Sequence, residues 1–261
     1  MTEPLQDATV TGLADLLDGA ALRAEAADRP VDEPAVPVAY AVQREMLRRR
    51  VEAGARQVGV KLGFTSRAKM EQMGVDSVIA GFLLDSHEVA DGDALDRTAL
   101  IHPRVEPEIA FRISRDVAAD APVAQVLAAV DAVAPALEVI DSRYRDFRFR
   151  LGDVIADNTS AARFVVGAWQ PVPDEISDLE VTMTVDGEVA ASGSTAAILG
   201  DPWEALLELR GLPDATHLGL RKGDVVLAGA ATEAVPLPER GEVVARVQGL
   251  GAARLGIGGA R

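Results

Sequence analysis

Apolar side chains at helical spacing dominate the start of the chain. They recur at i, i+3 and i+4 across residues 9–27, which predicts an amphipathic helix that Thr11 would cap. A proline-broken stretch, residues 28–37, follows. A second helix is predicted over residues 38–54, with Gly54 at its end. The apolar positions behind these two predictions are Leu13, Leu16, Leu17, Ala20, Ala21, Val38, Val42, Met46 and Leu47.

From residue 57 onward the pattern changes to short strands bounded by glycine. "QVGVKLGF" at 57–64 is typical of a strand. "LEVTMTVDGEVAASG" at 179–193 alternates apolar and polar residues around Asp186-Gly187, which is a strong hairpin signal. Two more strands are predicted near the C-terminus, in "GDVVLAGA" and "GEVVARVQGLG".

Three further helices are predicted among these strands. They cover "SRAKMEQMG", closed by Gly74, a helix in 122–137 that runs into a strand at "LEVID", and residues 201–212. The pattern shows no regular βαβ alternation and no repeat, which argues against a doubly wound sheet. We therefore expect an α+β protein with a small helical N-terminal region, residues 1–56, and a larger mixed β part, residues 57–261.

The composition indicates a globular protein with an acidic surface. The 261 residues are 48% hydrophobic and 26% charged, with a net charge of -15 and no cysteine. Such a surface should repel nucleic acid and anionic membranes. The N-terminus lacks the basic-then-apolar plan of a signal peptide, and no run approaches about 18 apolar residues. We expect a cytoplasmic protein that binds neither nucleic acid nor membrane.

One lysine has an unusual setting. Only three of the 26 basic residues are lysines, and Lys61 alone among them follows an apolar, strand-like run. A lysine there either snorkels to the surface or is placed for chemistry, because burial readily shifts its pKa.

Two glutamates interrupt another apolar run, "HPRVEPEIAF" at 102–111. In a strand, Glu106 and Glu108 would point to the same face and repel each other. Water, an arginine, a shared proton or a metal ion must compensate. A solvated edge strand is the simpler alternative, since Pro107 favours an edge.

A third carboxylate, Glu138 in "LEVID", has a similar setting. Three carboxylates from two strands could form an open oxygen-donor site of the kind that suits Mg²⁺ or Mn²⁺. The three histidines show no ligand spacing, which argues against a zinc site.

Four segments together resemble the fumarylacetoacetate hydrolase superfamily: "KLGFTSRAKMEQMGV", "IHPRVEPEIAF", "LEVIDSRYRDFRFRLGDVIADNTSAARFVVG" and "VQGLGAARLGI". Within it they are similar to the branch of 2-keto-4-pentenoate hydratases and 4-oxalocrotonate decarboxylases of aromatic meta-cleavage pathways. The resemblance runs from about residue 38 to the C-terminus. It implies a mixed β-sandwich roll, with Mg²⁺ or Mn²⁺ held by Glu106, Glu108 and Glu138, and with Lys61 as the active-site lysine.

The stretch "GVDSVIAGFL" distinguishes the two activities. Hydratases of this branch carry an aspartate where this chain has Ile79, whereas decarboxylases carry isoleucine. The resemblance thus implies decarboxylation of 2-oxohex-3-enedioate to 2-hydroxypenta-2,4-dienoate, with Ile79 as an apolar pocket wall. Asn158 and Ser160 are further candidates for substrate contacts. The alternatives are a hydratase, an acylpyruvate C–C hydrolase and a non-catalytic subunit.

The resemblance also implies partners. We expect a small anionic 2-oxo acid as substrate, a homo-oligomer, and association with a hydratase of the same pathway.

Overall fold

Two helices precede the sheets in the computed structural model, which describes residues 3–67, 70–71, 75, 77–118 and 121–258. Helix α1 spans Glu3–Arg23 and α2 spans Val36–Glu52. The second agrees with its prediction within two residues at each end. The first begins earlier than predicted, so Thr11 lies inside the helix and is not its cap. Residues 5–8 contain good helix formers and no breaker, which lets the helix extend upstream.

The larger sheet has seven strands. Its order is β2-β1-β9-β4-β5-β6, with β10 paired to β4. The sheet curls until β2 and β6, the first and last strands of this order, contact each other. The predicted strand at 57–64 is confirmed as β1. The strands are β1 Gln57–Gly63, β2 Ile79–Leu84, β4 Arg104–Ile113, β5 Val130–Ile140, β6 Ala161–Val166, β9 Val225–Ala230 and β10 Val235–Pro236.

The smaller sheet has five strands in the order β3-β12-β11-β7-β8. Asp186 (φ 51°) and Gly187 (φ 85°) form the two-residue turn between β7 and β8, so the predicted hairpin is confirmed. The strands are β3 Ala94–Leu95, β7 Glu180–Val185, β8 Glu188–Ser194, β11 Gly241–Val247 and β12 Gly251–Ile257.

Shorter helices connect the strands. The helix predicted over 201–212 is confirmed as α6, Pro202–Gly211. The one predicted in 122–137 is much shorter, because α4 covers only Val123–Leu127 and β5 begins at Val130. Proline disfavours a helix interior, and Pro135 pairs instead with the long strand β4. The helix predicted at 66–74 falls largely outside the described residues. Among the described residues, the remaining helices are α5 Leu151–Ala156, η1 Asp85–His87, η2 Arg97–Ala99, η3 Arg145–Phe147, η4 Asn158–Ser160, η5 Thr195–Ala197 and η6 Pro213–Leu218.

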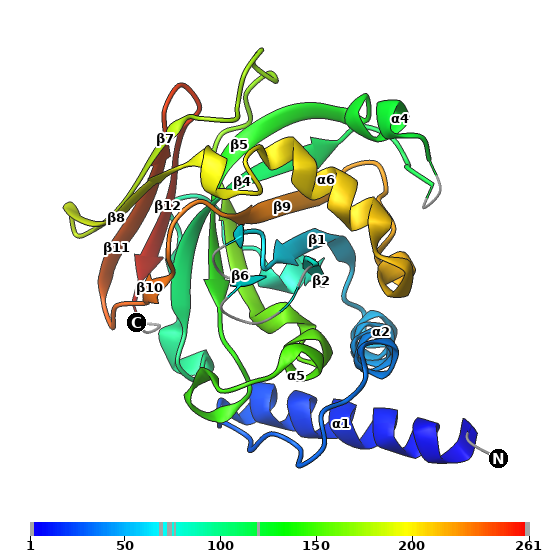
Figure 1. Cartoon of the computed structure of the whole chain (residues 1–261). Helices are drawn as coiled ribbons and strands as arrows, with labels where there is room; N and C mark the ends of the chain where they lie inside the picture. The colour runs from blue at the N-terminus through cyan, green and yellow to red at the C-terminus, as the bar shows by residue number, and fades with distance from the viewer. Residues whose placement is uncertain (1–2, 68–69, 72–74, 76, 119–120, 259–261) are drawn as a thin grey trace.

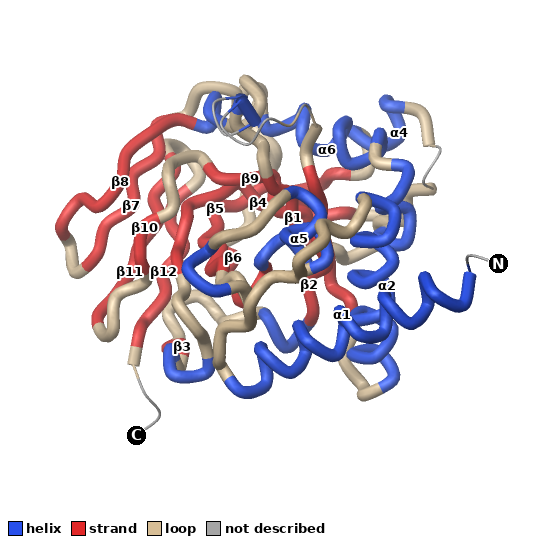
Figure 2. Tube along the Cα trace, turned by 60° about the horizontal axis from the view of Figure 1, so that its bottom comes forward, coloured by secondary structure: helices blue, strands red, loops and turns tan. Residues whose placement is uncertain are grey.

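The molecule is layered around the curled sheet. The five-stranded sheet lies on one side, and α1, α2 and α6 lie on the other (Figures 1 and 2). One core cluster lies between the two sheets, and another joins the helices to the curled sheet. The predicted α+β class, with helices ahead of mixed sheets, is confirmed. The division at residue 56 stays a prediction: β1 does begin at Gln57, yet Leu17 of α1 shares a core cluster with Phe82 of β2.

Among the helices that the structure describes, none combines the length and apolar character needed to cross a membrane.

Candidate metal centre

Three glutamates meet inside the curled sheet. In the β4–β5 ladder, Glu106 faces Glu138 directly, and Glu108 lies two residues further on the same face. Their side chains are 5%, 1% and 0% exposed. One oxygen of each lies within 4.8 Å of the others. We call these three residues the carboxylate cluster.

The alternative of a solvated edge strand is wrong. Strand β4 lies between β9 and β5, and all three glutamates are buried. Pro107 is tolerated because the β4–β9 ladder begins at Glu108, so proline costs it no hydrogen bond.

Lys61 enters the cluster from β1. Its Nζ lies 2.9 Å from Oε2 of Glu138 and donates a hydrogen bond to the carbonyl of Thr159 at 3.2 Å. The residue is 2% exposed, so it does not snorkel to the surface. Burial acts to lower the pKa of Lys61, but the charges of Glu138, Glu106 and Glu108 outweigh it and raise that pKa above its ordinary value. Lys61 is therefore an ammonium group at neutral pH.

Burial also raises the pKa of two glutamates. The pKa of Glu108 lies well above its ordinary value, first through burial and then through the charges of Glu138 and Glu106. The pKa of Glu138 is raised by burial too, although Lys61 opposes that shift. The charge of Lys61 thus does not offset the burial of Glu108 and Glu138.

The cluster fits a hard divalent cation. Oε1 of Glu108 and Oε1 of Glu138 are buried and accept no hydrogen bond from any residue that the structure describes. Such orphaned anionic oxygens are costly without a partner. Carboxylate oxygens are the ligands that Mg²⁺ and Mn²⁺ prefer, so the cluster could bind either ion.

A backbone amide fixes one of the glutamates. The N–H of Gly229 donates to Oε2 of Glu108 at 2.8 Å. Gly229 has φ 119°, and a Cβ there would lie 2.0 Å from Oγ1 of Thr65. Only glycine suits this close approach. No side-chain pattern in the sequence indicates this main-chain contact.

Residues 158–160 close the curled sheet beside Lys61. All three have left-handed backbone, with φ between 49° and 58°. The side-chain amide of Asn158 accepts a hydrogen bond from the N–H of Phe82 (2.8 Å) and donates one to its carbonyl (3.0 Å). Thr159 Oγ1 donates to the carbonyl of Ala80 at 3.0 Å. We call this junction of residues 158–160 with β2 the seam.

Two predicted substrate contacts lie in the seam. Both polar atoms of the Asn158 side chain are engaged with Phe82. Oγ of Ser160 is buried and has no hydrogen-bond partner within the described part of the chain. Their roles stay predictions, and the geometry favours Ser160. The part that the Thr159 carbonyl plays in holding Lys61 was not foreseen, because residue type carries no signal for a main-chain acceptor.

Ile79 lies near this junction. It pairs with Gly63, two residues along β1 from Lys61, and is 2% exposed. A Cβ at Gly63 would meet Thr159 Cγ2 at 2.6 Å and Ile79 Cγ1 at 3.0 Å. Ile79 and Thr159 therefore lie on the side of the sheet to which Lys61 points. The role of Ile79 as a pocket wall stays a prediction.

The histidines make other contacts. His102 Nε2 lies 2.8 Å from the Ser142 carbonyl, and His217 Nε2 lies 3.1 Å from Gln43 Oε1. Among the described residues, the one candidate ion-binding group is formed by glutamates alone.

Comparisons with known proteins agree with this geometry. A family model described as fumarylacetoacetate (FAA) hydrolase C-terminal matches residues 62–257. A 4-oxalocrotonate decarboxylase from Pseudomonas sp. is 44% identical over 254 residues, covering 97% of this chain and 99% of that protein. A 2-keto-4-pentenoate hydratase from Burkholderia vietnamiensis is 39% identical over 221 residues, covering 83% of this chain and 84% of that protein.

A solved structure is similar over nearly the whole chain. It is 4-oxalocrotonate decarboxylase from Pseudomonas putida G7 complexed with magnesium and adipate. It superimposes with a TM-score of 0.90 at 36% identity, covering 96% of this chain and 98% of that one.

Proposed function

The chain belongs to the fumarylacetoacetate hydrolase family, and we propose that it is a divalent-metal-dependent decarboxylase of 2-oxohex-3-enedioate (4-oxalocrotonate). The observation that carries the proposal is the meeting of Glu106, Glu108 and Glu138 with Lys61 inside the curled sheet. The decarboxylases at 37–44% identity support this reaction more strongly than the hydratases do.

We assign Glu106, Glu108 and Glu138 as the residues that hold Mg²⁺ or Mn²⁺. When bound, the cation supplies Lewis-acid stabilisation for negative charge on a 2-oxo acid. The glutamates are carried by two adjacent strands, which fixes their spacing without help from a loop.

We assign Lys61 as the hydrogen-bond donor to the C2 oxygen of the substrate, which gains negative charge during the reaction. The electron pair of the breaking C5–C6 bond moves through the C3=C4 double bond onto the C2 oxygen, and CO₂ leaves. One proton is then taken up, which gives 2-hydroxypenta-2,4-dienoate. A buried ammonium group can donate a hydrogen bond to that oxygen as its charge develops. The Thr159 carbonyl keeps Nζ in place.

We assign Ile79 to the wall of the substrate pocket and Ser160 to a contact with the substrate. An apolar wall solvates the departing carboxylate poorly, which favours its loss as neutral CO₂. The buried, unengaged hydroxyl of Ser160 is available to a polar group of the substrate.

Hydration of 2-hydroxypentadienoate is the second candidate, because hydratases share much of the chain's length and sequence. It requires a polar group to position water, and Ile79 provides none. C–C hydrolysis of an acylpyruvate is less well supported, since no histidine joins the described cluster. Assembly as a homo-oligomer, association with a hydratase and a cytoplasmic location belong to the same proposal.

The test is direct. Purified protein with Mg²⁺ and 2-oxohex-3-enedioate should release CO₂, and Glu108→Gln should not, since it loses an anionic ligand. Glu188→Gln, on the exposed strand β8, is the matched control and should behave as wild type. Efficient hydration of 2-hydroxypentadienoate with no CO₂ from the dicarboxylate would reject the decarboxylase and favour the hydratase.

A further inference from the structure

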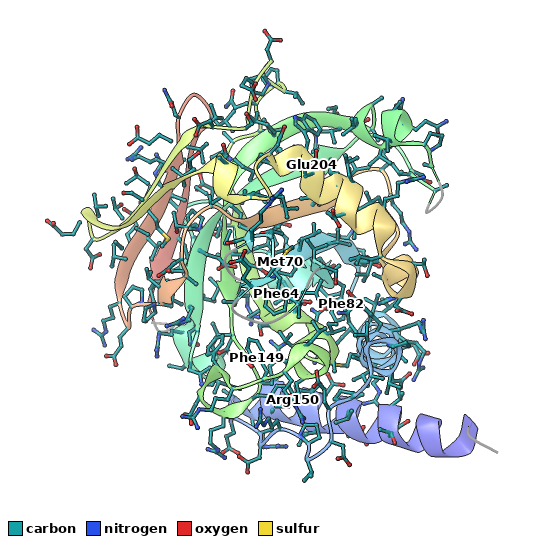
Figure 3. The ribbon with its side chains drawn as sticks, viewed as in Figure 1. Phe64, Met70, Phe82, Phe149, Arg150 and Glu204 are labelled. Atoms are coloured by element: carbon teal, nitrogen blue, oxygen red, sulfur yellow. The ribbon has the colours of Figure 1, made fainter. Side chains whose placement is uncertain are left out.

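A cavity lies on the other side of β2 from the carboxylate cluster. Its volume is about 410 Å³, and Phe82, Leu84 and Asn158 are among its lining residues. Lys61 pairs with Gly81, so Phe82 and Leu84 point to the opposite face of β2. Phe82 shares the core cluster of the N-terminal helices and lies between the central strands and α2 (Figure 3). None of the four charged residues of the metal centre lines this cavity. We call it the arginine cavity.

Arginines give the cavity its chemistry. Four arginines line it, and the one acidic lining residue is Asp141. The arginines are Arg23, Arg50, Arg143 and Arg163. Both oxygens of Asp141 already accept hydrogen bonds, from the N–H groups of Ile101 and His102. Four arginines against one aspartate make the formal charge of the lining residues positive, although the whole chain carries -15.

Arg163 is the cavity arginine without a carboxylate in contact. Arg143 pairs with Asp157 and Arg50 pairs with Asp18, each at 2.5 Å. Arg23 pairs with Glu25 at 3.6 Å. Arg163 is only partly exposed and donates to the neighbouring carbonyl of Ala162, and no ion pair within 4.0 Å joins it to a described carboxylate. Asp141 acts on Arg163 only at longer range, so this half-buried guanidinium can bind a further anion.

The pKa of His87 reflects the positive charge of the cavity arginines. Burial, followed by the charges of Arg163, Arg143 and Arg50, lowers the pKa of this cavity residue to about 3. The three guanidinium groups therefore act on the same space.

One part of the wall is apolar. It includes Met46, Leu84, Leu100 and the ring of Phe82, which stacks on His87 at 6.3 Å between centroids. The volume falls within the range of small-molecule sites, about 300–1,000 Å³. We propose that the arginine cavity binds a small carboxylic acid with an apolar or aromatic body, with its carboxylate on Arg163.

The cavity is connected to the metal centre by three consecutive links. Asn158 lines the cavity and clamps the backbone of Phe82. The next residue, Thr159, holds Nζ of Lys61 through its carbonyl. A ligand that presses on Phe82 and Asn158 would therefore change the position of Lys61, and so the rate. This coupling rests on the proposed function, whereas binding in the cavity does not.

Benzoate is a suitable probe, and calorimetric titration of the Mg²⁺-loaded protein measures its binding. We expect Arg163→Gln to weaken benzoate at least ten-fold, and benzamide, which lacks the charge, to bind the wild type at least ten-fold more weakly. Glu108→Gln should bind benzoate as wild type does. Equal affinity in wild type and Arg163→Gln, or no binding at all, would overturn the proposal. Binding lost in Glu108→Gln but kept in Arg163→Gln would place benzoate in the metal centre and also overturn it.

A second variant tests the cavity without removing a charge. Ala99 lines it and is exposed, so Ala99→Trp can fill the space without disturbing the core. Loss of benzoate binding with an unchanged melting temperature is expected, and retained binding would refute the site even if Arg163→Gln fails to fold. Saturating benzoate should alter the rate of CO₂ release in wild type but not in Ala99→Trp. An unaltered rate would remove the coupling. Absence of CO₂ release under all conditions would reject the proposed function and leave the binding test standing.

Discussion

At the scale of single residues, the centre is defined by buried carboxylate oxygens that have no partner among the described residues. Lys61 pairs with Glu138, yet Oε1 of Glu138 and Oε1 of Glu108 accept no hydrogen bond from a described residue. Continuum arguments make such burial costly unless another cation joins it. A divalent ion would then neutralise the glutamates. The ammonium group of Lys61 would be free to donate a hydrogen bond to the substrate oxygen that gains negative charge.

Replacing Lys61 separates these two tasks. Lys61→Ala should keep or tighten Mg²⁺ binding, because a competing cation is removed, and should slow CO₂ release by roughly 10²–10⁴-fold. Lys61→Arg should not rescue the rate, since guanidinium is bulkier and stays protonated. Single-turnover rates at saturating Mg²⁺ measure this. Full activity in Lys61→Arg would mean that positive charge alone suffices.

Ile79→Asp tests the apolar wall. The new carboxylate would repel the departing one, so decarboxylation should slow by several-fold to hundreds-fold if about 1–3 kcal/mol of transition-state stabilisation is lost. Ile79→Val, which keeps the wall apolar, is the matched control and should retain most of the rate. Rates of CO₂ release decide the matter. Unchanged decarboxylation in Ile79→Asp would show that this side chain does not face the substrate.

The sequence predicted some of these residues better than others. The i, i+2 spacing of Glu106 and Glu108 was sufficient to place both on one face. Glu138 was a candidate because of its similar apolar setting, but its place opposite Glu106 depends on the register of β4 against β5, which no sequence pattern gives. The Thr159 carbonyl, which contacts Lys61, and the Gly229 N–H, which contacts Glu108, are main-chain groups. Their contacts depend on tertiary position, so no side-chain pattern in the sequence predicts them.

At the scale of elements, the seam is the unusual feature. Strand β2 is the edge of the curled sheet, and an edge normally presents unpaired backbone groups. Here one side-chain amide satisfies both the N–H and the C=O of Phe82, as a neighbouring strand would. The arrangement closes the sheet and also delivers the Thr159 carbonyl to Lys61.

Asn158→Ala should weaken this closure. It leaves two buried backbone groups without partners, at a cost of about 1–3 kcal/mol each. We expect the free energy of unfolding, measured in urea, to fall by about 2–5 kcal/mol. Gln248→Ala, which removes an exposed amide bonded to the N–H of Glu180 at 3.3 Å, should cost less than about 0.5 kcal/mol. An equal fall in the free energy of unfolding in both variants would mean that the Asn158 hydrogen bonds stabilise the fold no more than an exposed one does.

Element types were largely predictable, whereas their limits were not. Alternation around Asp186-Gly187 specified a hairpin because the turn chemistry and the period agree. The segment 122–137 misled because its alanines and valines suit either state, and pairing with the full length of β4 decided in favour of a strand.

At the scale of the whole molecule, stability is tied to the metal and to pH. The pKa values of Glu108 and Glu138 are raised in the folded state above their ordinary value of 4.5. The metal-free folded state therefore binds more protons than the unfolded state above that pH. The stabilisation from these protons is full below about pH 4.5 and is lost as pH rises through the folded pKa values.

Mg²⁺ should reverse this trend, because it replaces the protons and binds more tightly as pH rises. At 100 times its Kd, it should stabilise the fold by about 2.7 kcal/mol, which is roughly 5–10 °C in melting temperature. The difference in melting temperature with and without Mg²⁺ should widen between pH 5 and pH 8. Using the difference cancels other titrations, such as that of His87. A difference that does not change with pH would contradict a metal held by these glutamates.

The seam has a consequence at the level of the gene. Asn158 is the one asparagine in the chain. In the genetic code, every single-nucleotide change of an asparagine codon that alters the residue gives Asp, His, Ile, Lys, Ser, Thr or Tyr, and none of these carries a carboxamide. Glutamine, the only other carboxamide, lies at least two changes away. Every single-base change that alters this residue therefore removes the carboxamide that joins residues 158–160 to Phe82.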